Sequence, residues 1–196
     1  MILRHVFFSY GEKSVLRDVS LTLPKTGAVC LCGESGCGKT TLLRLLCGLK
    51  TPQAGDITDL PNRPAVVFQE DRLLPWATAR DNVALVLGNT PDAKARAADA
   101  LAAVGLSDEE QTRLPNALSG GQCRRVALAR ALALPDSDAL FLDEPFAGLD
   151  DDRVEQIAAL LRTIAAEKPV FVITHDEQDA PRLNATLWRM KNGTVE

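Results

Sequence analysis

The sequence has no apolar run long enough to cross a membrane, since nothing in it approaches the roughly 18 consecutive apolar residues that a spanning helix needs. Its first residues, 1–5, do not show the charged, apolar and cleavage regions of a secretory signal. It has no block of Lys and Arg, and its formal net charge is −4, whereas nucleic-acid-binding proteins usually carry a basic stripe. These absences predict a cytosolic protein whose partner is not a nucleic acid.

Cysteine patterns typical of metal or redox centres are also absent. The five cysteines form no Cys-x-x-Cys pair and show no matched spacing. Cys30 and Cys32 alternate along an apolar run, and Cys47 falls in the next expected helix. We therefore expect reduced, buried thiols that pack as small apolar side chains. A further hypothesis is that alkylation of Cys37, which lies in a glycine-rich loop, blocks that loop.

The apolar residues that are present, 46% of 196, suffice for one domain with a substantial core. Short apolar strands alternate with helices, which is typical of an α/β fold with a mostly parallel sheet. We expect strands at 2–8, 15–23, 28–32, 65–68, 139–143 and 169–174, and helices at 39–49, 78–105 (with a break at 88–91), 119–134 and about 154–164. The first two strands should pair antiparallel, and Pro52 and Gly55 should mark a turn. The domain is predicted to span residues 1–196, with a helical subdomain at 70–135 inserted in it.

A glycine-rich segment between an expected strand and an expected helix has the composition of a phosphate-binding loop. It satisfies the pattern G-x-x-x-x-G-K-[ST] with Gly33, Glu34, Ser35, Gly36, Cys37, Gly38, Lys39 and Thr40. Glycines let backbone N–H groups surround a phosphate, the Lys39 ammonium supplies charge to the β- and γ-phosphates, and the Thr40 hydroxyl can bind Mg²⁺. The flanking strand and helix favour this interpretation over a chance match in a glycine-rich turn.

Two adjacent carboxylates, Asp143 and Glu144, end the expected strand at 139–143. Because neighbouring strand positions point to opposite sides, the two acids can do different work. Asp143 would hold Mg²⁺ through water, and Glu144 would polarise the water that attacks the γ-phosphate. The alternative is an acidic strand end in solvent. The phosphate loop earlier in the chain favours the functional interpretation.

Three further polar or aromatic side chains occupy strand ends or turns. Gln69 ends the strand 65–68, where its amide can touch both metal and water, although a polar strand end is the simpler alternative. His175 follows the strand 169–174, a position where doubly wound sheets place ligands, although a lone His is usually structural. Tyr10, the only tyrosine, lies in an expected turn and is either a surface aromatic or a residue that stacks on a base.

The segment Leu118-Ser119-Gly120-Gly121-Gln122 precedes an arginine-rich helix. Small residues and backbone N–H groups at a helix N-terminus can bind an anion without a charged side chain. A loop and helix cap would explain the same residues. The phosphate-type loop at 33–40 favours the anion site, because two such sites in one small domain need a common ligand.

Together these segments resemble the nucleotide-binding subunit of an ATP-binding cassette (ABC) transporter over essentially the whole chain. The matching segments are the Walker A loop at 33–40, the Gln loop at Gln69, the signature at 118–122, the Walker B strand ending in Asp143-Glu144, the turn at 148–150 and the switch histidine His175. The signature is the most specific of them, because other P-loop ATPases lack it. The resemblance implies a P-loop NTPase core that binds ATP and Mg²⁺ and hydrolyses ATP.

The resemblance also implies how the site residues would work. Two subunits would pair head-to-tail, with each ATP between the Walker A loop of one and the signature of the other. One subunit would supply residues 33–40 and Thr41 to each ATP, and the other subunit would supply Ser119, Gly120, Gly121 and Gln122. Tyr10 would stack on adenine, Glu144 would be the general base and His175 would contact the γ-phosphate. Thr40, Gln69 and Asp143 would contact the metal.

The branch of the family is indicated by residues 69–76, QEDRLLPW, which are similar to the Gln-loop region of bacterial importers of nitrate, sulfonate and taurine type. There this region and the helical subdomain hold the coupling helix of a separate permease. The resemblance thus implies an importer subunit on the cytoplasmic face of the inner membrane, acting with a permease and a solute-binding protein. The alternative is a non-transport ABC ATPase that acts on DNA or ribosomes. Neither coiled-coil arms, zinc modules nor a second cassette is present to support that alternative.

Overall fold

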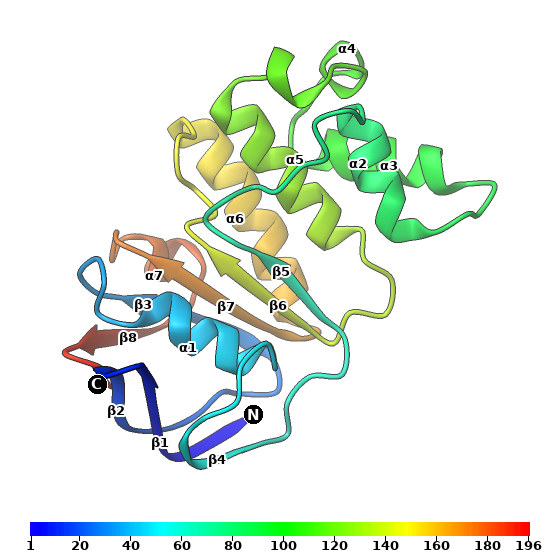
Figure 1. Ribbon diagram of the computed structural model, residues 1–196. Helices are drawn as coiled ribbons and strands as arrows, with labels where there is room; N and C mark the ends of the chain where they lie inside the picture. The colour runs from blue at the N-terminus through cyan, green and yellow to red at the C-terminus, as the bar shows by residue number, and fades with distance from the viewer.

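The computed structural model describes all 196 residues and contains two sheets with helices around them (Figure 1). The strands are β1 Ile2–Tyr10, β2 Lys13–Thr22, β3 Gly27–Cys32, β4 Ala54–Thr58, β5 Pro64–Val67, β6 Ala139–Asp143, β7 Pro169–Thr174, β8 Thr186–Lys191 and β9 Thr194–Val195. The helices are α1 Lys39–Leu46, α2 Ala79–Leu87, α3 Ala93–Ala103, α4 Asp108–Gln111, the 3₁₀ helix η1 Pro115–Ala117, α5 Gly120–Leu132, α6 Asp151–Ala165 and α7 Asp179–Arg182.

The larger sheet has the strand order β5-β6-β7-β3-β8-β9, and its first five strands are parallel. Its central strands are buried on both faces, as parallel strands between two layers must be. Leu140 and Leu142 pack in the cluster that contains α5 and α6, while Phe141, between them, packs in the cluster that contains α1 and the smaller sheet. The predicted α/β fold with a mostly parallel sheet is confirmed.

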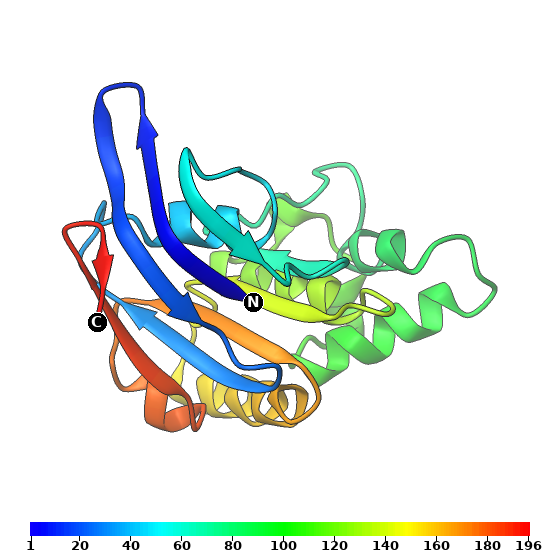
Figure 2. The ribbon, with the colours of Figure 1, turned by 90° about the horizontal axis from the view of Figure 1, so that it is seen from below.

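The smaller sheet is antiparallel, with the order β2-β1-β4, and it lies against the face that α1 also covers (Figure 2). The predicted pairing of the first two strands is present. The turn predicted at Pro52 and Gly55 is wrong for Gly55, which lies within β4. A Cβ atom at Gly55 would come within 2.1 Å of the His5 carbonyl oxygen, and its φ is +82°. Glycine is present there because the irregular β1–β4 pairing brings the two backbones together.

Several element ends also differ from the expected ones. Helix α1 ends at Leu46 instead of Leu49, and Gly48 follows with φ +70°, a conformation that favours glycine after a helix. Tyr10 is the last residue of β1, not part of the turn. Strands β8 and β9, which no pattern had indicated, extend the large sheet beyond β3. None of the helices is both long and apolar enough to cross a membrane.

The helical segments between β5 and β6 lie together at one side of the large sheet (Figure 1). Helix α5 packs against α2, α3 and β5, so it joins this helical block to the sheet. The loop from β5 to α2 is held by the fully buried Asn82, whose Nδ2 donates to the carbonyl oxygens of Leu74, Ala77 and Thr78. The proposed subdomain boundaries at 70 and 135 stay a prediction.

Candidate functional site

The parallel strands bring distant segments to one edge of the large sheet. In the β6–β7 pairing Asp143 lies opposite Ile173, and in the β3–β7 pairing Cys32 lies opposite Thr174. The residues that follow these positions are Glu144, His175 and the start of the glycine-rich loop. The carboxyl ends of parallel strands are where open α/β sheets bind ligands.

The glycine-rich loop at 33–38 leads from β3 into α1 and depends on glycine at two positions. A Cβ atom at Gly33 would lie 2.4 Å from the Met190 carbonyl oxygen, so no side chain fits there without a backbone shift. Gly38 precedes α1 with φ +119°. Lys39 Nζ donates to the carbonyl oxygens of Gly33 at 2.6 Å and Glu34 at 3.0 Å, which places the ammonium inside the loop. This arrangement of a strand, a loop and a helix N-terminus suits a phosphate group.

Thr40 and Asp143 meet at the bottom of the same edge. Thr40 Oγ1 donates to Asp143 Oδ2 at 2.9 Å, although the two residues are far apart in sequence. Burial raises the pKa of Asp143, and the charge of Glu144 adds to this effect, while the hydrogen bond from Thr40 opposes it. A nearby cation would relieve the cost of this buried carboxylate.

The donor set fits a Mg²⁺ ion that is held jointly with a phosphate ligand. No cluster of three or more His, Cys, Asp or Glu side chains able to hold a metal occurs in the structure. Mg²⁺ in phosphoryl-transfer sites takes one or two protein oxygens and completes its shell with phosphate and water oxygens. The Thr40 hydroxyl oxygen is one such protein oxygen, and the Asp143 carboxylate beside it can hold a water of the Mg²⁺ shell.

Glu144 and His175 form a hydrogen-bonded pair beside this position. The Glu144 Oε2 to His175 Nδ1 distance is 2.8 Å, and the side chains are 18% and 77% exposed. Glu144 has φ +55°, an uncommon backbone conformation for this residue type, and its N–H donates to the Ile173 carbonyl oxygen of β7. The strained turn points the carboxylate toward the sheet edge, where a base for a bound water would be needed.

Two adjoining cavities lie over this edge and share Ser35, Lys39, Gln69 and Glu144. One, of about 760 Å³, is also lined by His175, and the other, of about 300 Å³, by Tyr10, Thr40, Thr41 and Asp143. The structure thus brings together at these two cavities the predicted residues Tyr10, Gly33 to Gly36, Gly38 to Thr41, Gln69, Asp143, Glu144 and His175, while Cys37 of the same loop lines neither of them. At the outer end, Tyr10 is 42% exposed, with its ring 5.1 Å from Lys50 Nζ.

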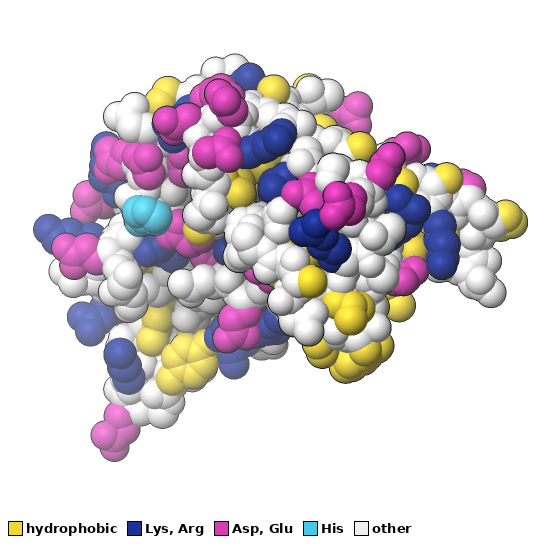
Figure 3. Space-filling view, turned by 90° about the horizontal axis from the view of Figure 1, so that it is seen from above, with side chains coloured by type: hydrophobic (Ala, Val, Ile, Leu, Met, Phe, Trp, Pro, Cys, Tyr) yellow, Lys and Arg dark blue, Asp and Glu magenta, His cyan; other side chains and the backbone are white.

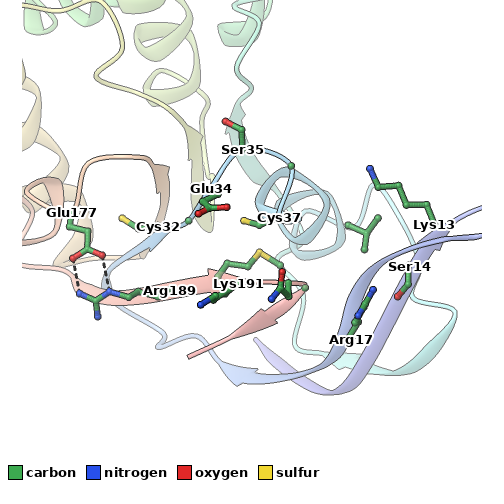
Figure 4. Close-up of a pocket in the computed structure, with 16 residues that line it drawn as sticks. Lys13, Ser14, Arg17, Cys32, Glu34, Ser35, Cys37, Glu177, Arg189 and Lys191 are labelled. Atoms are coloured by element: carbon green, nitrogen blue, oxygen red, sulfur yellow. Dashed lines mark hydrogen bonds and ion pairs between the residues drawn. The ribbon is translucent and has the colours of Figure 1, made fainter.

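A third cavity, of about 600 Å³, lies on the other side of the glycine-rich loop (Figure 4). Glu34, Ser35 and Cys37 approach it from the loop, while Arg189 and Lys191 approach it from β8. Arg189 is already bound to Glu177 through two hydrogen bonds. Over the face shown in Figure 3, basic and acidic side chains are interspersed, without a continuous basic stripe.

The signature segment does not line any of these three cavities. Ser119 is exposed and caps α5, and its hydroxyl oxygen accepts a hydrogen bond from the Gln122 N–H at 3.2 Å. The Gln122 side chain is engaged at both ends, since its Oε1 accepts from the Ser119 N–H and its Nε2 donates to Glu110 Oε1. The helix cap considered for the sequence is therefore present. The hydrogen bonds of the cap do not use the Ser119 O–H proton or the N–H groups of Gly120 and Gly121, so these groups can still donate to an anion.

One residue of the site was missed by the sequence patterns. Arg124 of α5 lines the larger cavity beside Gln69 and Glu144, and it is 4% exposed. The sequence showed it only as one arginine of an arginine-rich helix. The apolar residues Val126 to Ala129 that follow it could have indicated that Arg124 is buried. No local pattern could have indicated which residues accept its hydrogen bonds.

A glycine-rich phosphate loop on a parallel sheet, with a carboxylate pair at a neighbouring strand end, defines a P-loop ATPase. A family model described as "ABC transporter" matches residues 16–147. The chain is 48% identical over 188 residues to the "Aliphatic sulfonates import ATP-binding protein SsuB 3" of Paraburkholderia xenovorans, covering 95% of the chain and 74% of that protein. It is 41% identical over 204 residues to the SsuB protein of Rhodopseudomonas palustris (strain BisA53), covering 100% of the chain and 72% of that protein.

Among solved structures, the chain is similar to the dimeric post-hydrolysis state of the ATP-binding cassette MJ0796 bound to ADP and phosphate. The TM-score is 0.87 at 30% identity, and the match covers 100% of this chain and 96% of the other. The chain therefore belongs to the ABC transporter family, as its nucleotide-binding subunit with ATPase activity.

Proposed function

We propose that this chain powers solute import by hydrolysing ATP between two head-to-tail copies and passing the resulting movement to a separate membrane permease. The importer assignment is supported by the names of the relatives, which are import ATP-binding proteins. Those names extend the proposal to aliphatic sulfonates as the solute, which the permease and a solute-binding protein would contact. The chain would then work at the cytoplasmic face of the inner membrane.

The observation that carries the shared-site proposal is the position of the signature. Ser119 and the first residues of α5 form an anion site, yet they do not line the cavities of their own glycine-rich loop. A second copy can bring this anion site to the γ-phosphate, with Ser119, Gly120 and Gly121 facing it. Gln122 would contribute through its backbone and by fixing the cap, because its side-chain amide is already hydrogen-bonded.

Within each copy, residues 33–41 would bind the triphosphate and Tyr10 would stack on the adenine. Lys39 would turn from the loop carbonyls to the β- and γ-phosphates. Thr40, Asp143 and Gln69 would hold Mg²⁺, which supplies neutralising charge to the phosphate oxygens.

Glu144 would act as the general base for hydrolysis. Its carboxylate would accept a proton from the attacking water, and the neighbouring His175 would orient it through the Nδ1 hydrogen bond. His175 would also contact the γ-phosphate through its other ring nitrogen. Gln69 would place the attacking water. Val67 of β5 pairs with Leu142 of β6, and Gln69 and Glu144 each come two positions after their member of this pair, so they lie at the same level of the sheet edge.

The permease would contact the helical region at 70–135. The loop between β5 and α2 presents Trp76 with 75% of its surface exposed, and Leu85 of α2 is 61% exposed. Exposed large apolar side chains on a soluble subunit mark a partner surface. The loop starts at Gln69, so movement of the nucleotide site would reach this surface through a few residues.

The test is complementation between two inactive variants. Lys39→Ala removes phosphate binding in the glycine-rich loop, and Ser119→Arg blocks the signature. Each alone should lose nearly all ATPase activity. An equimolar mixture should regain about a quarter of the original activity, because about half of the dimers are then mixed and each mixed dimer has one complete site of two. The recovered activity should depend on the mixing ratio and be greatest at 1:1. A mixture as inactive as either parent would refute the shared site.

A further inference from the structure

Arg124 is a buried cation on α5, five positions after Ser119. Its side chain is 5% exposed, and its ion-pair partner is Asp71, at 3.0 Å from Nη1 to Oδ1. An arginine stays charged in proteins, so its burial is costly unless its N–H groups find acceptors. The identity of those acceptors therefore indicates what the residue holds in place.

The other acceptors are backbone carbonyl oxygens from two strand ends of the ATP site. Nη1 donates to the Phe68 oxygen at 2.7 Å, and Nη2 donates to the Gln69 oxygen at 3.2 Å and to the Asp143 oxygen at 2.9 Å. The first two carbonyls flank the start of the Gln69 loop, and the third immediately precedes Glu144. A single guanidinium thus joins α5 to the segments that carry Gln69 and Glu144.

A second arginine of α5 supports the same loop. Arg130 donates to the carbonyl oxygens of Asp71 at 2.8 Å and Arg72 at 2.9 Å. The helix that starts at the signature therefore holds the loop at two points. Only Arg124 also reaches β6, so Arg124 is the residue that connects the signature helix with both strand ends.

The geometry points to Arg124 as a positioning residue that links the two ATP sites of the dimer. When Ser119 engages the γ-phosphate of the partner's ATP, a shift of α5 moves Gln69 and Glu144 of its own site through this guanidinium. The link rests on the proposed head-to-tail dimer, because only there do Ser119 and Glu144 of one chain serve different nucleotides. We assign Arg124 a positioning role because its four Nη–H groups donate to Phe68, Gln69, Asp71 and Asp143 of the protein itself.

The link requires the planar fork of arginine and not only its charge. A guanidinium presents five N–H donors in fixed directions and can reach acceptors on two segments at once, whereas a lysine ammonium is a single point and a glutamine amide has two donors. Arg124→Gln and Arg124→Lys should therefore both break the link. A matched control is Arg113→Gln, which removes an exposed pair with Glu109 on the same helical block.

The first experiment measures steady-state ATPase kinetics of the purified full chain. In Arg124→Gln and Arg124→Lys we expect kcat to fall by about 10- to 100-fold, the scale of a misplaced catalytic group, with KM for ATP changed less than about threefold. The control should keep both constants. A kcat within twofold of the original protein in both variants, or an equal loss of ATP affinity, would overturn the proposal. Melting curves show whether each variant is folded. If Arg124→Gln does not fold, Arg124→Lys, which keeps the positive charge, serves as the test.

The second experiment uses the mixed dimer with one complete site, formed from Ser119→Arg and Lys39→Ala chains. Adding Arg124→Gln to the Ser119→Arg chain tests its effect on the Gln69 and Glu144 that this chain supplies to the complete site. Adding Arg124→Gln to the Lys39→Ala chain tests its effect on the signature that this chain supplies to the complete site. A link predicts reduced activity in both placements, and a reduction in only one placement would contradict it. If the unmodified mixture is inactive, the shared site fails instead, and the kcat and KM measurements still decide whether Arg124 positions Gln69 and Glu144.

Discussion

Replacing Glu144 by glutamine would remove the proposed general base while keeping the shape of the site. Glutamine has the same length, and its Oε1 can still accept the hydrogen bond from His175 Nδ1 that the carboxylate accepts at 2.8 Å. The backbone at this position, with φ +55°, is no harder for glutamine to adopt than for glutamate. We therefore expect the free energy of unfolding to change by less than about 0.5 kcal/mol, as for most substitutions that remove no packing.

The effect on hydrolysis should be much larger. A positioned general base typically contributes about 10²- to 10⁴-fold, which corresponds to about 3 to 5 kcal/mol of the barrier. Single-turnover hydrolysis of ATP in the presence of Mg²⁺ should slow by that factor, while ATP binding stays near its original strength. Because ATP then persists between the two copies, size-exclusion chromatography with ATP and Mg²⁺ should show a stable dimer.

Two controls separate the base from its neighbours. Glu144→Ala removes both the base and the partner of His175, so it should lose hydrolysis and also alter ATP binding. His175→Ala leaves the carboxylate in place and should slow hydrolysis without trapping a long-lived dimer as strongly. Single-turnover rates of Glu144→Gln within threefold of the original protein would refute the assignment of Glu144 as the base.

The remaining predictions concern the buried carboxylate and the cysteines. Since burial raises the pKa of Asp143 above its unfolded value, ionisation at neutral pH costs stability, and the cost disappears as pH falls through the folded-state pKa. Asp143→Asn should therefore raise the free energy of unfolding at pH 7 without Mg²⁺, and this gain should vanish below about pH 4, while hydrolysis is abolished. Urea denaturation at a series of pH values measures the gain. A gain in stability that grows on acidification would contradict the prediction. Burial raises the pKa of Cys30 and Cys47 to about 12, so iodoacetamide should modify the half-exposed Cys37 first and inhibit ATPase activity, and ATP should protect it. Peptide mass spectrometry gives the order of modification, and equal labelling of all five thiols would refute the burial argument.

The class of fold and most of the strands and helices of the large sheet followed from the sequence because they depend on local patterns. Apolar runs such as 139–143 and 169–174 can be recognised without knowing their neighbours. Gly55 could not be assigned in the same way, because glycine marks both turns and close backbone approaches, and only the position of His5 distinguishes them. Strand β8, with its mixed exposure, had no clear alternation to indicate it.

The candidate site was predictable residue by residue but not in its contacts. Gln69 and His175 each follow an apolar strand and Asp143 ends one, so each was indicated by the residues next to it in sequence. The pairing of Glu144 with His175 instead depends on β6 and β7 being neighbours in the sheet, which is a property of the chain's topology. Arg124 shows the same limit, since its four acceptors lie 19 to 56 residues away in sequence.

The proposed anion site and the proposed base differ in how much they depend on contacts between distant parts of the sequence. The proposed anion site at Ser119 consists of residues next to one another in sequence, so a helix cap is enough to build it. The proposed base Glu144 instead needs β6, β7 and the Gln69 loop to be held in register, and the buried guanidinium of Arg124 contacts two of these three segments. Ser119 caps α5 and Arg124 lies five positions further along the same helix, so a movement of this end of α5 on binding the partner's nucleotide would be passed to Gln69 and Glu144. One helix that presents the signature to the partner and holds the Gln69 loop of its own chain is a simple way to make two ATP sites respond to each other.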